Sequence, residues 1–328
     1  MIAYTFGATL RATTSARRNQ RLQIYLPIAD LPVNIFLVLG MGLAVGFISG
    51  MFGIGGGFLM TPLLIFIGIS PAVAVASVTS HIAASSFTGA INYWRKRAID
   101  IPLAMMLLSS GILGTATGVW LFTLLRELDQ LDLVIGLSYV TLLTTVGALM
   151  INESVQAELR TRRGKPATLR RPGSHTFVHG LPLKMRFKRS KIYVSAIPVW
   201  GIGFSIGFIG AILGIGGGFL LVPMLIYFLR VPTATVIGTS MVLTLVTMAS
   251  ATVMHAATNH LVDAVLALIL IVGGVIGAQF GARTGQKMRG ERLRLLLGLL
   301  VFAVGLRFAY ELVVQPDELY SIRLVGSE

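Results

Sequence analysis

The residues with the clearest capacity for chemistry are two identical glycine runs. Both read GIGGG, from Gly53 to Gly57 and from Gly214 to Gly218, and both are followed by Phe-Leu. Each glycine disfavours a helix by about 1 kcal/mol, so four in five residues predict a break, with a short helix beginning at Phe58 and at Phe219. The free N–H groups and partial positive charge of a helix N-terminus suit an anion. We therefore predict substrate binding at Gly53, Gly55, Gly56, Gly57, Gly214, Gly216, Gly217 and Gly218.

Two other interpretations of the glycine runs are open to test. Small residues also allow helices to pack closely within a membrane, without binding any ligand. A nucleotide-binding loop would need a Lys followed by Ser or Thr, and neither run has that continuation. Close packing therefore stays as the alternative to an anion site, whereas nucleotide binding is disfavoured.

A stripe of polar residues follows each glycine run at helical spacing. In the first copy it consists of Ser77, His81, Ser85, Thr88 and Asn92, which share one helix face, and in the second of Ser240, Thr244, Thr247 and His255. Hydrogen bonds between helices, worth about 0.6 kcal/mol each, would also explain such residues. From this region we predict neutral substrate donors at Thr79, Ser80, Asn92, Thr239 and Ser240.

The titratable residues within the apolar segments are few. His81 and His255 are the only histidines there, and either could carry a proton near neutral pH or be a satisfied buried residue. Asp100 and Asp263 stand at the entrances of segments, so we expect helix N-caps. The chain has no cysteine, and His175 and His179 lack a third metal ligand. We expect no catalytic residues, metal, cofactor or enzymatic activity.

Composition indicates the elements that must position these residues. The chain of 328 residues is 55% hydrophobic and 12% charged. No charged residue occurs from Leu31 to Trp94, and only Arg230 and Asp263 occur from Ile192 to Ala282. A membrane-spanning helix needs about 20 apolar residues, so each stretch can hold several. We predict an all-α fold, a polytopic transmembrane helical bundle.

The bundle is expected to consist of two repeats. Gly53 and Gly214, Pro62 and Pro223, and Pro71 and Pro232 are each 161 positions apart. With small shifts, Thr79-Ser80 aligns with Thr239-Ser240, and Asp100 aligns with Asp263. The predicted division is an N-terminal basic tail (1–30), repeat 1 (31–151), a basic connector (152–192), repeat 2 (193–314) and a C-terminal tail (315–328). The expected segments are 33–52, 58–69, 72–93, 101–125 and 131–150, then 194–213, 219–229, 233–257, 261–282 and 293–314.

Charge in the loops indicates orientation. The connector holds eleven Lys/Arg against two Glu, which is typical of a cytoplasmic loop in a bacterial inner membrane. With five crossings per repeat, the loops after the third and fourth segments have reciprocal charge, which predicts inverted repeats and external termini. That places the four arginines of the N-terminal tail outside. A four-crossing arrangement, with the short second segment re-entrant, would place them inside instead.

The doubled GIGGGFL, the following Pro62 or Pro223, and the glycine-spaced segments 111–118 and 274–281 resemble the sulfite exporter TauE/SafE family of anion transporters. The resemblance implies secondary transport of sulfite, a sulfonate or a related organosulfur anion, with export favoured. The expected partners are that anion and the lipid bilayer, with no nucleic acid, and a homo-oligomer is left open. The alternative is a membrane scaffold or sensor that acts through the basic connector.

Overall fold

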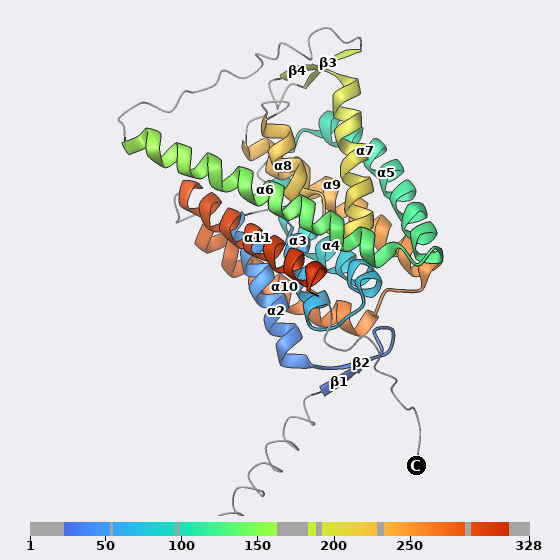
Figure 1. Ribbon diagram of the computed structural model, residues 1–328. Coiled ribbons are helices and arrows are strands. Elements are labelled where there is room, and N and C mark those ends of the chain that lie inside the picture. The colour runs from blue at the N-terminus through green and yellow to red at the C-terminus, as the bar shows by residue number, and fades with distance from the viewer. Residues whose placement is uncertain are drawn as a thin grey trace, which may run out of the picture. The chain divides into compact units, whose positions relative to one another are not determined.

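The computed structural model describes residues 23–52, 55–95, 97, 99–162, 183–187, 192–227, 233–285 and 290–314 (Figure 1). Helices form at all ten predicted segments. Repeat 1 contains α2 (Ile35–Phe52), α3 (Gly57–Phe66), α4 (Pro71–Arg95), α5 (Ile101–Glu127) and α6 (Leu131–Arg162). Repeat 2 contains α7 (Ala196–Leu213), α8 (Gly218–Tyr227), α9 (Thr233–Met254), α10 (Ala264–Gly285) and α11 (Gly290–Val313).

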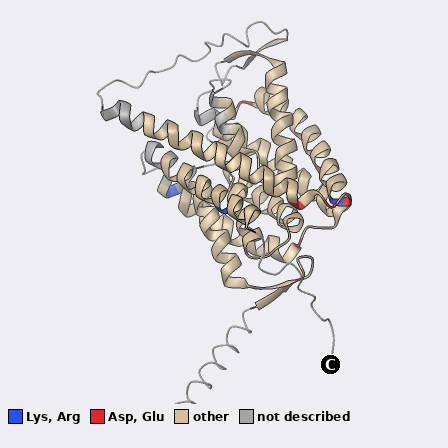
Figure 2. Cartoon of the chain, viewed as in Figure 1, with Lys and Arg blue, Asp and Glu red and all other residues tan. Residues whose placement is uncertain are grey.

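The helices have the character of a multi-pass membrane protein. Among the described residues, five helical stretches are long and apolar enough to cross a bilayer: 101–127, 131–156, 196–213, 237–259 and 264–281. Lys, Arg, Asp and Glu are sparse along the described helices (Figure 2). The predicted helical membrane bundle is therefore confirmed.

Each repeat opens with a β-hairpin that the sequence did not indicate. The strands β1 (Gln23–Leu26) and β2 (Leu31–Asn34) pair antiparallel and lead into α2. The strands β3 (Lys184–Phe187) and β4 (Ile192–Ser195) do the same before α7. The second hairpin lies 161 positions after the first, so the repeat begins earlier than the apolar segments suggested.

A helix and a strand extend into the range 152–192, the predicted connector. The helix α6 continues to Arg162, and β3 lies within the range 152–192. The remainder of that range, 163–182 and 188–191, falls outside the described residues, as do the predicted tails over 1–22 and 315–328.

The chain forms two compact units. The helices α6 and α11 belong to the smaller one, and the other eight α-helices named above belong to the larger. In the smaller unit the rings of Tyr139 and Phe308 stack with centroids 5.4 Å apart. A Cβ at Gly147 would lie 2.8 Å from Phe302 N, and one at Gly305 would lie 2.9 Å from Thr144 Oγ1. A later residue of α6 thus contacts an earlier residue of α11, so these helices run antiparallel.

In the larger unit, helices from different repeats pack together through glycine. The helix α2 lies along α10, and α5 lies along α7. A Cβ at Gly46 would overlap the carbonyl oxygen of Gly274, and one at Gly207 would overlap that of Gly111. The backbones therefore approach closely, as in small-residue packing of membrane helices. Contacts advance in the same direction along both partners, so each pair is parallel.

The third helices of the two repeats, α4 and α9, pack against each other in opposite directions. The hydroxyls of Thr79 and Thr252 are hydrogen-bonded at 2.8 Å. A Cβ at Gly89 would lie 2.8 Å from Met241 Sδ. A later position on α4 thus meets an earlier one on α9, so these equivalent helices are antiparallel.

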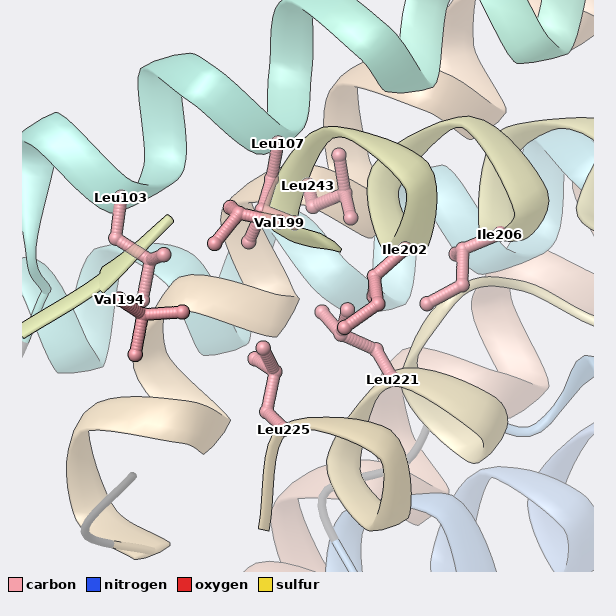
Figure 3. Packing of buried hydrophobic residues seen from close by; sticks show 9 residues of the cluster. All are labelled: Leu103, Leu107, Val194, Val199, Ile202, Ile206, Leu221, Leu225 and Leu243. Carbon is pink, nitrogen blue, oxygen red and sulfur yellow. The ribbon is translucent and has the colours of Figure 1, made fainter. Parts of the chain in front are cut away.

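Apolar packing fixes the short helix of repeat 2 in the larger unit. Its buried residues Leu221 and Leu225 join side chains from α5, α7, α9 and β4 (Figure 3). The whole cluster consists of Leu103, Leu107, Val194, Val199, Ile202, Ile206, Leu221, Leu225 and Leu243.

One aspartate caps the N-terminus of the fourth helix in each repeat, as the sequence predicted: Asp100 for α5 and Asp263 for α10. The Oδ1 atom of Asp263 accepts from the backbone N–H groups of Val265 and Leu266, both at 3.0 Å. Asp100 Oδ1 accepts from Leu103 N at 3.5 Å. These bonds satisfy N–H groups that a helix leaves free in its first turn.

Candidate functional site

The two glycine breaks lie against each other in the interior of the larger unit. A Cβ at Gly57 would lie 2.6 Å from the carbonyl oxygen of Gly214 and 2.7 Å from that of Ile215. A Cβ at Gly216 would lie 3.5 Å from the carbonyl oxygen of Gly55. All of these residues are buried. Residues 157 to 161 positions apart in sequence therefore meet. Gly53 is outside the described residues.

The backbone in both breaks has a conformation that favours glycine. Gly55 and Gly56 have φ angles of 86° and 48°, and Gly214 and Gly216 have 62° and 75°. This left-handed region is open to glycine and costs other residues energy. The predicted interruption of the helix is confirmed on both sides, because α2 ends at Phe52 and α7 ends at Leu213.

The short helices begin at this meeting point. The carbonyl oxygen of Gly56 accepts from Leu59 N and Met60 N at 3.2 Å, and that of Gly217 accepts from Leu221 N at 2.8 Å. The first side chains beyond the breaks, Phe58 and Phe219, stack with centroids 4.4 Å apart and an interplanar angle of 11°. Two helix N-termini, each with a partial positive charge, thus come together in an apolar setting.

Two buried hydroxyls border the breaks and have no hydrogen-bond partner within the described part of the chain. They belong to Ser86 on α4 and Thr244 on α9, each 1% exposed. Ser86 Oγ lies 3.9 Å from the place of a Cβ at Gly55, and Thr244 Oγ1 lies 3.2 Å from that at Gly217. The sequence placed Thr244 in the polar stripe but did not single out Ser86. The sequence offered no signal that separates Ser86 from the other hydroxyl residues of this segment.

The neutral donors predicted from the sequence form hydrogen bonds within the fold. Thr79 Oγ1 donates to Ala76 O at 2.6 Å, Ser80 Oγ donates to Ser77 O at 2.7 Å, and Ser240 Oγ donates to Ile237 O at 2.9 Å. None of these contacts involves a glycine of either break. The Asn92 side chain is outside what the structure describes.

A reciprocal pair of hydrogen bonds shows which residue of α4 is equivalent to which residue of α9. The hydroxyl of Thr239 accepts from Asp100 N at 3.4 Å, and that of Ser77 accepts from Asp263 N at 3.0 Å. Ser77 and Thr239 therefore hold equivalent positions, 162 apart. The sequence alignment had matched Thr79 with Thr239, which is two residues away from this register.

The two histidines have different surroundings. His255 Nε2 donates to Ala211 O at 3.2 Å, and Asn259 Nδ2 donates to His255 Nδ1 at 3.3 Å. Its ring also meets Phe122 edge-on, with centroids 4.6 Å apart. His255 and Asn259 are the first and last residues of the π-helical turn η1 (His255–Asn259), which continues α9. His255 is therefore satisfied on both ring nitrogens.

His81 is buried, and its Nδ1 atom has no hydrogen-bond partner among the described residues. The ring occupies the space beside Gly274 of α10, where a Cβ would overlap it. Of the two histidines, only His81 keeps a free ring nitrogen.

Residues 38–308 match a family model described as Sulfite exporter TauE/SafE. The chain belongs to this family. A probable membrane transporter protein of Xylella fastidiosa (strain 9a5c) is 31% identical over 277 residues, covering 83% of this chain and 94% of that protein. The probable membrane transporter protein YjnA of Bacillus subtilis is 24% identical over 84% of this chain and 99% of its own length.

A shorter match joins this TauE/SafE chain to a plant protein. Sulfite exporter TauE/SafE family protein 3 of Arabidopsis thaliana is 30% identical over 77 residues, covering 24% of this chain and 16% of that protein. No solved structure matches the chain. Since the family and its relatives are named as membrane transporters, the expectation of a transporter rather than an enzyme is confirmed.

Proposed function

We propose that this TauE/SafE protein is a secondary transporter that exports a small organosulfur anion, such as sulfite or a sulfonate, across a bacterial inner membrane. The observation that carries the proposal is the meeting of two glycine breaks and two helix N-termini in the buried centre of the larger unit. Helix N-termini in discontinuous membrane helices commonly face anionic substrate groups. The family description and the plant relative's printed name favour sulfite as the first anion to test.

The transport cycle we infer is alternating access between two inverted repeats. The antiparallel course of α4 and α9, the equivalent third helices, is what such an inversion requires. A substrate site at the interface of inverted repeats can open to either side as one repeat moves against the other. In this arrangement the basic connector is cytoplasmic and both termini are external, consistent with the loop charges.

The predicted substrate residues enter the proposal unequally. Gly57 N already donates to Gly55 O at 2.5 Å and Gly214 N donates to Gly210 O at 2.9 Å. The proposed donors are therefore the backbone N–H groups of the other glycines in the breaks: Gly55, Gly56, Gly216, Gly217 and Gly218. Neutral donors allow release, because an anion paired with a buried arginine would be held strongly.

A proton-linked role is proposed for His81 alone. Its free ring nitrogen leaves it able to take up a proton without breaking an existing bond. The substitution His81→Gln is expected to remove the dependence of methanesulfonate flux on a pH gradient while flux itself continues; the charge of this anion does not change with pH. Unchanged pH-gradient dependence in this variant would contradict the role.

The transport site is tested by sulfite flux in proteoliposomes. In Gly216→Leu, the new side chain would clash with Ile82, and leucine would have to adopt the unfavourable φ angle of 75°. We therefore expect at least a tenfold loss of flux. The matched control is Gly201→Leu, because nothing lies within 4 Å of a Cβ at this helical glycine. Normal flux in a correctly folded Gly216→Leu protein would show that the glycine breaks are not the site.

The scaffold or sensor alternative is separated by deleting residues 166–180 of the connector. A transporter should retain flux after this deletion, whereas a protein that acts through the connector should lose its output.

A further inference from the structure

The two side chains with unpartnered hydroxyls, Ser86 and Thr244, both border Gly55. A Cβ at Gly55 would lie 3.7 Å from Thr244 Cγ2 and 3.9 Å from Ser86 Oγ. Thr244 Oγ1 also borders Gly217 of the other break. A buried hydroxyl without a partner costs stability, so its persistence at a shared point indicates a ligand that completes its hydrogen bonds.

The equivalent positions in the opposite repeat are apolar. In the register set by Ser77 and Thr239, the counterpart of Thr244 is Ile82 and the counterpart of Ser86 is Met248. Gly216, the counterpart of Gly55, accordingly borders Ile82 Cγ2, at 2.9 Å from the place of a Cβ. The pair of unpartnered hydroxyls on Ser86 and Thr244 thus has no symmetric counterpart in the other repeat.

No basic side chain accompanies this site along its own helices. Between Leu31 and Trp94 there is no Lys or Arg, and Arg95 stands nine positions after Ser86, about 13 Å along the helix. The one basic residue from Ile192 to Ala282, Arg230, follows α8 and is outside the described residues. On the described parts of α4 and α9, the groups near the site that can meet the charge of a bound anion are therefore hydroxyls, backbone N–H groups and helix dipoles.

Such a site should discriminate by charge. The Born cost of burying an ion rises with the square of its charge, so a dianion costs about four times as much as a monoanion of the same radius. Neutral donors do not compensate that difference, because they offer no full positive charge.

We propose that Ser86 and Thr244 bind the transported anion directly, and that this site selects singly charged over doubly charged anions. The inference rests on the proposed transport function and deepens it. For sulfite, the transported form would be hydrogensulfite, not the dianion.

The test measures sulfite flux in proteoliposomes containing the full-length protein, with two competitors of fixed charge. Methanesulfonate, a monoanion, should inhibit at a concentration at least tenfold lower than sulfate, a dianion. Across pH, the flux should follow the concentration of hydrogensulfite. Equal inhibition by sulfate, or flux that follows the dianion, would overturn the charge selectivity.

The residues are tested by substitution next to matched controls. Ser86→Ala and Thr244→Val should each raise the half-saturating concentration of hydrogensulfite by roughly tenfold to a hundredfold, the loss expected for a hydrogen bond to a charged group. Ser85→Ala and Thr247→Val should leave it unchanged, because those hydroxyls bond to Ile82 O at 3.0 Å and Leu243 O at 2.8 Å.

A conservative variant separates binding from misfolding. Thr244→Ser keeps the hydroxyl and should retain near-normal affinity, even if Thr244→Val proves unstable in detergent. Unchanged affinity in Ser86→Ala and Thr244→Val, or loss of affinity in Thr244→Ser equal to that in Thr244→Val, would overturn the assignment while anion flux by the parent protein still stood. Absence of anion flux in the parent protein would overturn the proposed function and this inference together.

Discussion

His255 and His81 are alike in sequence context, since each lies in the third segment of its repeat. In the structure, the two imidazole rings differ in their hydrogen-bond partners. His255 bonds through both nitrogens, and its partner Asn259 also accepts from Thr123 Oγ1 at 3.0 Å. Arg126 Nη1 donates to Asn259 O at 3.0 Å. This network joins the end of α9 to the end of α5, so His255 has a structural role.

The substitution His255→Leu should therefore lower stability. It removes the hydrogen bond to Ala211 O and one of the two bonds of Asn259 Nδ2, which still donates to Thr258 Oγ1 at 3.1 Å. The loss at the buried carbonyl is expected to cost roughly 1–3 kcal/mol. We expect a lower midpoint of thermal unfolding in detergent, while the pH dependence of flux is retained. Unchanged stability together with a flattened pH profile would contradict the structural role.

At this scale the sequence predicted some residues well. Asp100 and Asp263 could be predicted as caps because each directly precedes an apolar helical run, a local pattern. Ser86 could not be predicted, because a hydroxyl on a helix has a carbonyl of its own helix within reach. Thr79 and Ser80 use such carbonyls, whereas Ser86 does not. That choice depends on the tertiary neighbours.

Among the elements, the interfaces of α2 with α10 and of α7 with α5 are packed through glycines on successive turns. A Cβ at Gly50 would overlap the carbonyl oxygen of Ala278, and one at Gly114 would overlap that of Phe204. Backbone atoms cannot move aside as a flexible side chain can. The sequence raised close packing as an alternative to an anion site at GIGGG, and the structure shows close packing both at these helical glycines and at Gly57 and Gly216 within the breaks.

Alanine substitutions should divide the helical glycines into two classes. Gly46→Ala and Gly207→Ala place a methyl group against backbone and should lower the unfolding midpoint and monodispersity of the purified protein. Gly40→Ala and Gly201→Ala have no atom within 4 Å of the new Cβ and should be neutral or stabilising by about 1 kcal/mol. Size-exclusion chromatography and thermal unfolding measure both effects. Equal stability across all four variants would contradict the close approach of the helices.

In the whole molecule, helices of one repeat pack against helices of the other. The first helix of each repeat lies along the fourth helix of the other, so α2 pairs with α10 and α7 with α5. The sequence predicted two copies of five segments, because Gly, Pro and Asp recur at matching positions. It did not predict which segments pair, because glycine stripes on four helices fit several partners equally well.

Because helices of one repeat pack against helices of the other, we predict that neither repeat is stable when it is produced alone. Residues 1–170 and 171–328, produced as separate chains, should each aggregate or be degraded, because α2, α5, α7 and α10 would lack their partners. Produced together they should copurify and restore anion flux. A monodisperse 1–170 chain with cooperative unfolding would contradict this prediction.

The parallel pairing of α2 with α10 also bears on biogenesis. The helix α2 begins at Ile35 and its partner begins at Ala264. At ribosomal rates of about 5–20 residues per second, α2 waits roughly 10–45 s for its partner to be made. During that interval its glycine face is open to lipid or to an insertase. Biogenesis of this protein therefore depends on whatever holds the early helices apart until the ribosome has nearly finished.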